Sequence, residues 1–199
     1  MKTYKIHTLI LCALILSACG QIAQTPKTDI NLNLPTSISN PTTSPPASPS
    51  SQPKYSNLVG LKTKDGQIVI KLYDKEAPKT VKNFLNKVNS GFYNNLTFHR
   101  VVSNFVVQGG DPTGTGSGGG TIASELNNIP FKRGSLGLAR TAQSKDISND
   151  SQFYICLTDI ECSHLTSEYV NFGEVVSGLD VLDKIRQGDL ILEMTTTTK

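Results

Sequence analysis

The chain has 199 residues and a formal net charge of +3 at pH 7, and 18% of its residues are charged. So mild a charge, without interleaved basic and aromatic residues, argues against a protein that binds nucleic acid. Of its 4 cysteines, only Cys156 and Cys162 lie beyond the N-terminal segment. Two cysteines are too few ligands for a zinc site, so the sequence predicts no bound metal.

The N-terminus has the layout of an export signal. Lys2 and Lys5 make a positive start, and an apolar run follows at 6–16. That run is too short to span a bilayer, which takes about 20 residues. The tetrapeptide Leu-Ser-Ala-Cys at 16–19 resembles the lipobox of bacterial lipoproteins, in which the cysteine carries lipid after cleavage. This resemblance predicts a signal peptide at 1–18 and lipidation of Cys19; the alternative is an ordinary secretory signal with an incidental cysteine.

Residues 19–55 are predicted to form a disordered tether. The stretch at 36–53 is rich in Ser, Thr and Pro, and it cannot bury enough apolar surface to offset its ordering entropy. We expect it to hold the following domain away from a bacterial membrane, on the extracytoplasmic side, in the outer membrane and periplasm or at the cell surface. A proline-rich peptide ligand is the alternative interpretation. The remainder, 56–199, is long enough for one domain with its own core, which we expect to be monomeric.

The domain begins with a predicted hairpin and a helix. Two β-prone runs, at 58–63 and 67–73, flank Lys64-Asp65-Gly66, and Asp-Gly between such runs is typical of a hairpin. Apolar residues then recur at i, i+3, i+4 and i+7, which predicts a helix beginning near Pro78 and ending by Gly91. They are Val81, Phe84, Leu85 and Val88.

Six further β-prone runs follow, at 97–102, 105–108, 135–140, 152–157, 170–176 and 190–196. A second helix is predicted at 179–187, with Val181, Leu182 and Ile185 on its buried side. Eight strands with one early and one late helix predict a mainly β fold. The expected architecture is a closed eight-stranded antiparallel barrel capped by two α-helices, because closure removes sheet edges.

Two segments carry most of the functional information. The first, 98–111, joins Arg100 to an alternating apolar run and a glycine-rich turn; the second, 151–155, repeats its aromatic and amide chemistry. Together with other segments in the same order, they resemble the active-site strands of the cyclophilins, the peptidyl-prolyl cis-trans isomerases. The resemblance covers roughly residues 57–195. It implies the barrel fold with two helices, and proline-containing peptides and unfolded or exported proteins as partners.

This reaction sets definite demands on a site. Rotation about a peptide bond faces a barrier of about 18–20 kcal/mol, because the nitrogen shares its lone pair with the carbonyl. A catalyst must favour the twisted amide, whose nitrogen has regained that lone pair. It therefore needs a hydrogen-bond donor near the prolyl nitrogen, an apolar hollow for the ring and polar groups that hold the flanking backbone. No cofactor is required, and none is predicted.

The resemblance implies roles for individual residues. Arg100 matches the catalytic arginine that faces the proline, Phe105 the aromatic floor of the proline pocket, and Gln108 the amide that grips substrate backbone and arginine. Val106 replaces a common pocket methionine. His99 lies on the opposite strand face, since side chains alternate, and is expected at the pocket rim rather than as a base. Without the resemblance, Arg100 would be an ordinary exposed or ion-paired strand arginine.

The other walls of the implied pocket are further substrate contacts. They are Ala139, Arg140, Gln152, Tyr154, Leu165 and Tyr169. Arg140 stands where many members have Asn and some bacterial members have Arg. Tyr154 stands where the family usually has Phe, and its buried hydroxyl must find a partner or water.

Two other motifs do not lead to a site. Residues 114–119 fit G-x-G-x-x-G, but no helix follows and no acidic residue lies about 20 positions on, so a dinucleotide site is not expected. No G-x-S-x-G elbow supports a hydrolase. For Cys156 and Cys162, two alternatives stay open: a disulfide in an exported protein, or a buried thiol at Cys156.

The sequence therefore predicts a peptidyl-prolyl cis-trans isomerase that accelerates rotation about X-Pro bonds in exported or surface proteins and so assists their folding. The alternative is a surface-tethered module or chaperone that binds proline-containing peptides with little turnover.

Overall fold

The computed structural model describes residues 57–197. The predicted signal peptide at 1–18, the lipidation site Cys19 and the predicted tether at 19–55 lie outside the described residues. Within the described part of the chain, no helix is both long enough and apolar enough to cross a membrane.

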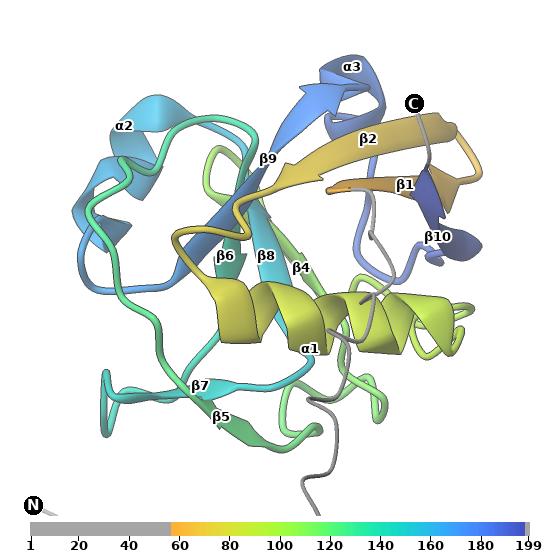
Figure 1. Ribbon diagram of the computed structural model, residues 1–199. Coiled ribbons are helices and arrows are strands. Elements are labelled where there is room, and N and C mark those ends of the chain that lie inside the picture. The colour runs from red at the N-terminus through yellow and green to blue at the C-terminus, as the bar shows by residue number, and fades with distance from the viewer. Residues whose placement is uncertain (1–56, 198–199) are drawn as a thin grey trace, which may run out of the picture. The chain divides into compact units, whose positions relative to one another are not determined.

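One antiparallel sheet of eight strands dominates the domain (Figure 1). Its strands are β1 (Leu58–Thr63), β2 (Gly66–Leu72), β3 (Arg100–Val102), β4 (Val106–Gly109), β6 (Ser135–Leu138), β8 (Phe153–Cys156), β9 (Asn171–Ser177) and β10 (Glu193–Thr197). They lie in the order β10-β1-β2-β9-β6-β8-β4-β3. Each overlaps one of the eight predicted strands, and the mainly β character of the fold is confirmed.

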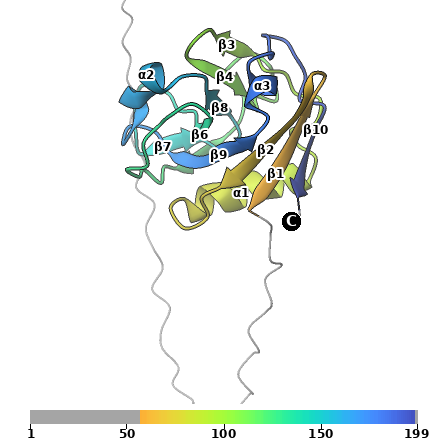
Figure 2. The same cartoon turned by 90° about the horizontal axis from the view of Figure 1, so that it is seen from above.

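The sheet is curled rather than flat (Figures 1 and 2), but the closed barrel expected from the sequence is not shown. The continuous ladder ends at β10 and β3. Close to these two end strands, Thr97 and Leu190 form only an isolated bridge. β3 has only three residues and pairs with β4.

The predicted hairpin joins β1 to β2. Thr63 pairs with Gly66, which leaves Lys64 and Asp65 as the two-residue turn. The Thr63 hydroxyl accepts a hydrogen bond from the Asp65 N–H at 3.2 Å and donates one to the Gly66 carbonyl at 3.1 Å. Turn chemistry visible in the sequence therefore sets the register of this strand pair.

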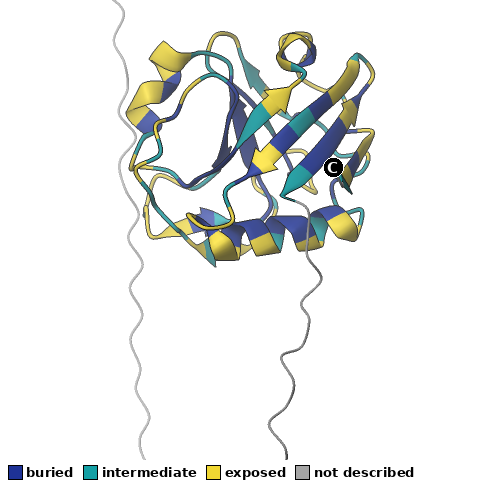
Figure 3. Cartoon of the chain, turned by 45° about the horizontal axis from the view of Figure 1, so that its top comes forward, coloured by how far each residue is buried: buried dark blue, intermediate teal, exposed yellow. Residues whose placement is uncertain are grey.

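The first predicted helix is confirmed as α1 (Pro78–Asn89), with Pro78 at its first turn. Its apolar stripe is buried against the sheet, and its opposite side is exposed (Figure 3). The second predicted helix is shorter than expected: α3 (Leu179–Leu182) has four residues. Beyond it the N–H groups of Lys184 and Ile185 bond to carbonyls three residues back, so the chain tightens into turns instead of continuing the α-helix.

Four short elements were not predicted. They are β5 (Thr121–Ala123), β7 (Ile147–Asn149), α2 (Asp159–Cys162) and a 3₁₀ turn at Ser163–Leu165. β5 and β7 form a separate two-stranded sheet. Each element has only three or four residues, which is too short for an apolar period to repeat.

Buried apolar residues form two clusters that share β4 and β8. Side chains alternate along a strand, and Val107 and Ile155, paired across these strands, belong to the main core. Their neighbours Val106 and Cys156, also paired, belong to the smaller cluster. The strand pair therefore has one side in the main core and presents the smaller cluster on the other.

A disulfide lies within the smaller cluster. It joins Cys156 of β8 to Cys162 at the end of α2, with Cα atoms 6.2 Å apart. Of the two alternatives that the sequence left open, the structure has the paired one. The bond ties α2 to the sheet and so fixes the start of the 3₁₀ turn that carries Leu165.

Candidate active site

A cavity of about 190 Å³ lies over the smaller cluster, and nine predicted site residues line it. They are Arg100, Phe105, Val106, Gln108, Ala139, Arg140, Tyr154, Leu165 and Tyr169. Sites for drug-sized ligands span about 300–1,000 Å³. This cavity therefore suits a single small ring better than a large ligand.

The β3–β4 hairpin supplies one wall of the cavity. Val106 and Gln108 are separated by one residue of β4 and so share the face opposite Val107, which packs in the main core. The Phe105 N–H donates to the Val102 carbonyl at 3.0 Å and closes the turn between the strands. This turn brings the Phe105 ring to the cavity just before β4 begins.

Arg100 lies directly opposite Gln108 in the hairpin register. Its Nη1 donates to Gln108 Oε1 at 3.2 Å, and its Cζ is 5.9 Å from the centroid of the Phe105 ring. Within residues 57–197, Gln108 is the one hydrogen-bond partner of the guanidinium. Since an arginine has five N–H donors and stays charged, most of them remain available to a ligand in the cavity.

Aromatic rings form another part of the cavity lining, where Tyr154 of β8 is paired with Gln108 of β4. Tyr154 of β8 stacks on Phe131 with ring centroids 5.8 Å apart, and it meets Tyr169 edge-on at 5.9 Å. The Arg140 guanidinium lies over Tyr169, 4.4 Å from the ring centroid, as in a cation–π pair. Three predicted residues are therefore brought together, while Phe131 was missed because it lies in a loop without a distinctive motif.

Arg140 also braces the loop that carries Tyr169. Its Nε donates to the Glu168 carbonyl at 3.1 Å, and its Nη2 lies 3.6 Å from the Glu168 carboxylate. Only 11% of the Arg140 side chain is exposed. This arginine is therefore held in place by its neighbours, whereas Arg100 is exposed.

His164 and Leu165 complete the rim. The His164 ring stacks on Phe105, with centroids 5.8 Å apart and an angle of 23° between the rings. Leu165 is buried in the smaller cluster and lines the cavity. His164 was not among the predicted site residues, although it directly precedes Leu165 in the segment that the resemblance matches to one wall of the pocket.

Gln152 and His99 lie outside the main cavity. Gln152 lines a neighbouring hollow of about 140 Å³, which shares Gln108, Ala139 and Arg140 with the cavity. His99 lines neither of them. Burial lowers the pKa of His99 below its ordinary value, so its ring is uncharged at neutral pH and the structure gives it no contact with the cavity.

The Tyr154 hydroxyl is buried without a hydrogen-bond partner among the described residues. Tyr154 pairs with Gly137 of β6, and a Cβ at Gly137 would overlap the phenol ring. The absence of a side chain at Gly137 therefore makes room for a tyrosine here. Burial raises the pKa of Tyr154 well above its ordinary value, so the hydroxyl stays protonated.

We expect Tyr154→Phe to stabilise the protein by about 1 kcal/mol, because an unpaired buried hydroxyl costs roughly 1–3 kcal/mol. Tyr93→Phe is the matched control: the Tyr93 hydroxyl is also buried, but it donates to the Ser151 carbonyl at 3.2 Å. Loss of this hydrogen bond in Tyr93→Phe should destabilise the protein by about 1 kcal/mol. Urea unfolding of both variants measures the difference, and equal losses of stability would contradict the assignment.

Comparisons with known proteins agree with this geometry. Residues 58–198 match the family described as cyclophilin type peptidyl-prolyl cis-trans isomerase/CLD. The chain is 44% identical over 137 residues to a peptidyl-prolyl cis-trans isomerase of Helicobacter pylori, covering 66% of this chain and 81% of the relative. It is 41% identical over 139 residues to peptidyl-prolyl cis-trans isomerase B of Escherichia coli, covering 65% and 84%.

A solved structure gives the same result. The crystal structure of a cyclophilin type peptidyl-prolyl cis-trans isomerase from Cryptosporidium parvum, determined in the presence of the dipeptide Ala-Pro, matches with a TM-score of 0.65. It shares 30% sequence identity, and the match covers 71% of this chain and 99% of that one. The fold and the site define a cyclophilin. The chain belongs to the cyclophilin-type peptidyl-prolyl cis-trans isomerase family, and its activity is the isomerisation of X-Pro peptide bonds.

Proposed function

We propose that Arg100 is the catalytic residue of this isomerase and acts by stabilising the twisted amide. In that state the prolyl nitrogen regains its lone pair and accepts a hydrogen bond, which the guanidinium donates. No proton is transferred, so the rate gain comes from a preorganised charge and from positioning. The observation that carries this proposal is the exposed guanidinium beside a ring-sized cavity, held by Gln108 at 3.2 Å.

The remaining residues divide into two groups in this proposal. Phe105, Val106, Tyr154 and Leu165 receive the proline ring, because they are the apolar and aromatic part of the cavity lining. Polar and small residues hold the peptide backbone on either side of the ring. They are Gln108, Ala139, Gln152 and Tyr169, with Arg140 beside them.

The test of this proposal separates an enzyme from a binding module. The cis-to-trans rate of a Xaa-Pro peptide is measured by NMR exchange with catalytic amounts of the protein, and the affinity for the same peptide is measured by titration. We expect exchange far faster than the uncatalysed tens to hundreds of seconds. Tight binding with an unchanged exchange rate would instead favour the surface-tethered module or chaperone.

The setting of the activity is also part of the proposal. The lipobox-like tetrapeptide at 16–19 and the Ser/Thr/Pro-rich stretch at 36–53 support a domain tethered by lipid to the extracytoplasmic side of a bacterial membrane, and we propose that this domain is monomeric. Its substrates would then be exported or surface proteins. The pairing of Cys156 with Cys162 is consistent with this location, since structural disulfides are rare in the cytosol.

Metabolic labelling tests the membrane anchor. We expect the full-length protein expressed in bacteria to incorporate labelled palmitate and to sediment with membranes. Cys19→Ser should abolish both, because the thiol is the proposed attachment point, while Cys12→Ser should still be labelled if processing occurs before residue 19. Labelling that persists in Cys19→Ser would contradict the proposal.

A further inference from the structure

A row of hydrogen bonds runs from Arg100 away from the cavity. Arg100 Nη1 donates to Gln108 Oε1 at 3.2 Å, and Gln108 Nε2 donates to Gln152 Oε1 at 3.0 Å. Gln152 Nε2 then donates to the carbonyls of Gly116 and Gly118 at 3.0 and 2.8 Å. Gln152 is only 3% exposed, so water does not compete for these contacts.

The two loop carbonyls give this row a direction. A carbonyl oxygen only accepts hydrogen bonds, so the NH₂ end of Gln152 must face Gly116 and Gly118. The Gln152 oxygen then faces Gln108 and takes its NH₂ group. The Gln108 oxygen is left facing Arg100. The loop therefore determines which end of each amide points toward the guanidinium.

Asp111 holds the loop in the shape that presents these carbonyls. Its buried carboxylate, 1% exposed, accepts hydrogen bonds from the Thr113 N–H at 2.8 Å, from the Thr113 hydroxyl at 2.9 Å and from the Gly116 N–H. A Cβ at Gly118 would overlap the same carboxylate. Burial alone raises the pKa of Asp111, but hydrogen bonds from Thr113, Gly116 and Gly118 outweigh it and lower the pKa to about 2.

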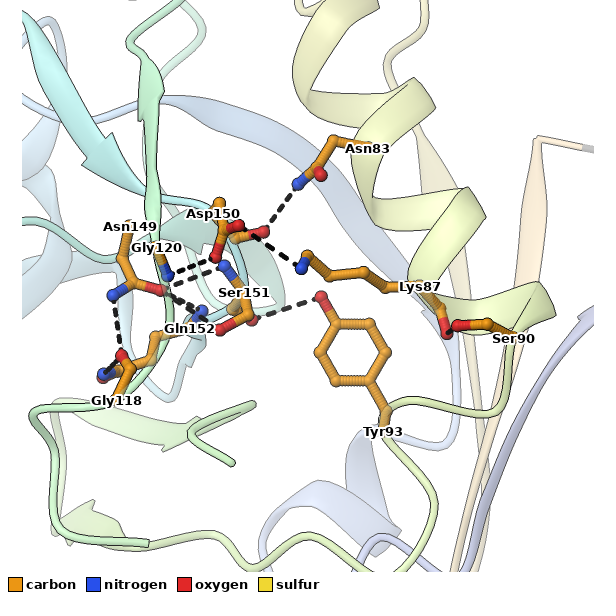
Figure 4. Close-up of polar contacts among 10 residues, drawn as sticks. All are labelled: Asn83, Lys87, Ser90, Tyr93, Gly118, Gly120, Asn149, Asp150, Ser151 and Gln152. Carbon is orange, nitrogen blue, oxygen red and sulfur yellow. Dashed lines mark hydrogen bonds and ion pairs between the residues drawn. The ribbon is translucent and has the colours of Figure 1, made fainter. Parts of the chain in front are cut away.

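The segment 149–152 fixes the other side of the loop. Figure 4 shows Asn149 and Gln152 both reaching Gly118, and Asn149 Nδ2 donates to the Gly118 carbonyl at 2.9 Å. Asp150 accepts from the Gly120 N–H at 2.8 Å and lies 3.4 Å from Lys87 Nζ of α1. The loop carbonyls are therefore held from two sides, by Asp111 within the loop and by this segment across from it.

We infer that Asp111 is a positioning residue for the isomerase, acting on Arg100 through the glycine loop, Gln152 and Gln108. The inference rests on the proposed catalytic role of Arg100. Asp111 lines neither the cavity nor the neighbouring hollow, so we assign its effect to the hydrogen bonds that it makes to the loop. The loop that fits G-x-G-x-x-G is then part of the catalytic apparatus rather than a nucleotide site.

A double-mutant cycle on the full-length protein tests this inference. In the wild-type background, we expect Asp111→Asn to lower kcat/KM by about tenfold, mostly through kcat, because a misplaced donor loses transition-state contact. The asparagine loses one acceptor and with it the bond from the Gly116 N–H. In the Arg100→Ala background, Asp111→Asn should cause no further loss of activity, although it should still lower stability by the same amount.

Glu125→Gln is the matched control for a purely structural carboxylate. Glu125 accepts hydrogen bonds from the backbone N–H groups of Lys79 and Thr80 at 3.1 and 2.8 Å, in the first turn of α1. Loss of this carboxylate should lower stability and leave kcat/KM unchanged. If Asp111→Asn fails to fold, Thr113→Val serves in its place, since it removes the hydroxyl bond to the Asp111 carboxylate at a residue that lines neither the cavity nor the neighbouring hollow.

The outcomes separate the positioning role of Asp111 from the catalytic role of Arg100. The positioning role is wrong, and the role of Arg100 stands, if Arg100→Ala lowers activity and Asp111→Asn does not. The same holds if Asp111→Asn lowers activity equally in both backgrounds. If Arg100→Ala leaves activity unchanged, both are wrong. A loss confined to the wild-type background supports the inference.

Discussion

Replacement of Arg100 by alanine is expected to lower kcat/KM for a Xaa-Pro peptide by about 10²-fold or more, as the loss of a key electrostatic donor does in other enzymes. The physical reason is that the guanidinium interacts more strongly with the pyramidal nitrogen of the twisted amide than with the planar one. The loss should therefore appear chiefly in kcat. Peptide binding should change little, because the apolar lining of the cavity is untouched.

Two further substitutions define what the arginine contributes. Arg100→Lys keeps the charge but replaces a planar fork by a point charge, so we expect only partial activity. Arg186→Ala removes an exposed arginine whose Nη1 bonds to the carbonyls of Asp183 and Ile185 and which does not line the cavity; it should leave kcat/KM unchanged. Activity equal to wild type in Arg100→Ala would overturn the proposed mechanism.

The parts of the fold that the sequence predicted correctly depend on short-range patterns. The Asp-Gly turn sets the β1–β2 register through contacts between residues at most three positions apart, and α1 follows from one apolar period. The length of α3 was wrong, because the apolar period continues to Ile185 while the backbone changes to tighter turns. Periodicity reports which side is buried and does not report which hydrogen bonds the backbone makes.

The site shows the same division between local and long-range information. Arg100, Phe105 and Gln108 lie within nine residues of one hairpin. Cross-strand pairing puts Arg100 and Gln108 on one face, while Phe105 reaches the cavity from the turn before β4. Glu168 and Phe131 contact the lining residues Arg140 and Tyr154 across distant segments of the chain. The role of Asp111 depends on which loop carbonyls face Gln152, and that is a property of the folded chain alone.

Replacement of Phe84 by alanine is expected to have the largest effect on stability, a loss of about 3–5 kcal/mol. Phe84 of α1 is 1% exposed, and its ring lies 5.1 Å from Tyr93, 5.7 Å from Phe153 and 5.2 Å from Phe172. These partners come from three other segments, so removal of the ring leaves a cavity that no single side chain can fill. A domain of this size is stable by only about 5–15 kcal/mol.

Urea unfolding measures the effect of Phe84→Ala, with Lys82→Ala on the exposed side of the same helix as the control; the control should stay within about 0.5 kcal/mol of wild type.

The Phe84→Ala variant also tests how far the core and the site are independent. Phe84 packs on Phe153, whose side chain faces the main core, while the next residue, Tyr154, faces the cavity. The kcat/KM per folded molecule should therefore stay close to wild type, because strand alternation separates the ring that stabilises the sheet from the ring that receives proline. A loss of stability below about 1 kcal/mol would mean that the aromatic cluster can collapse around the missing ring.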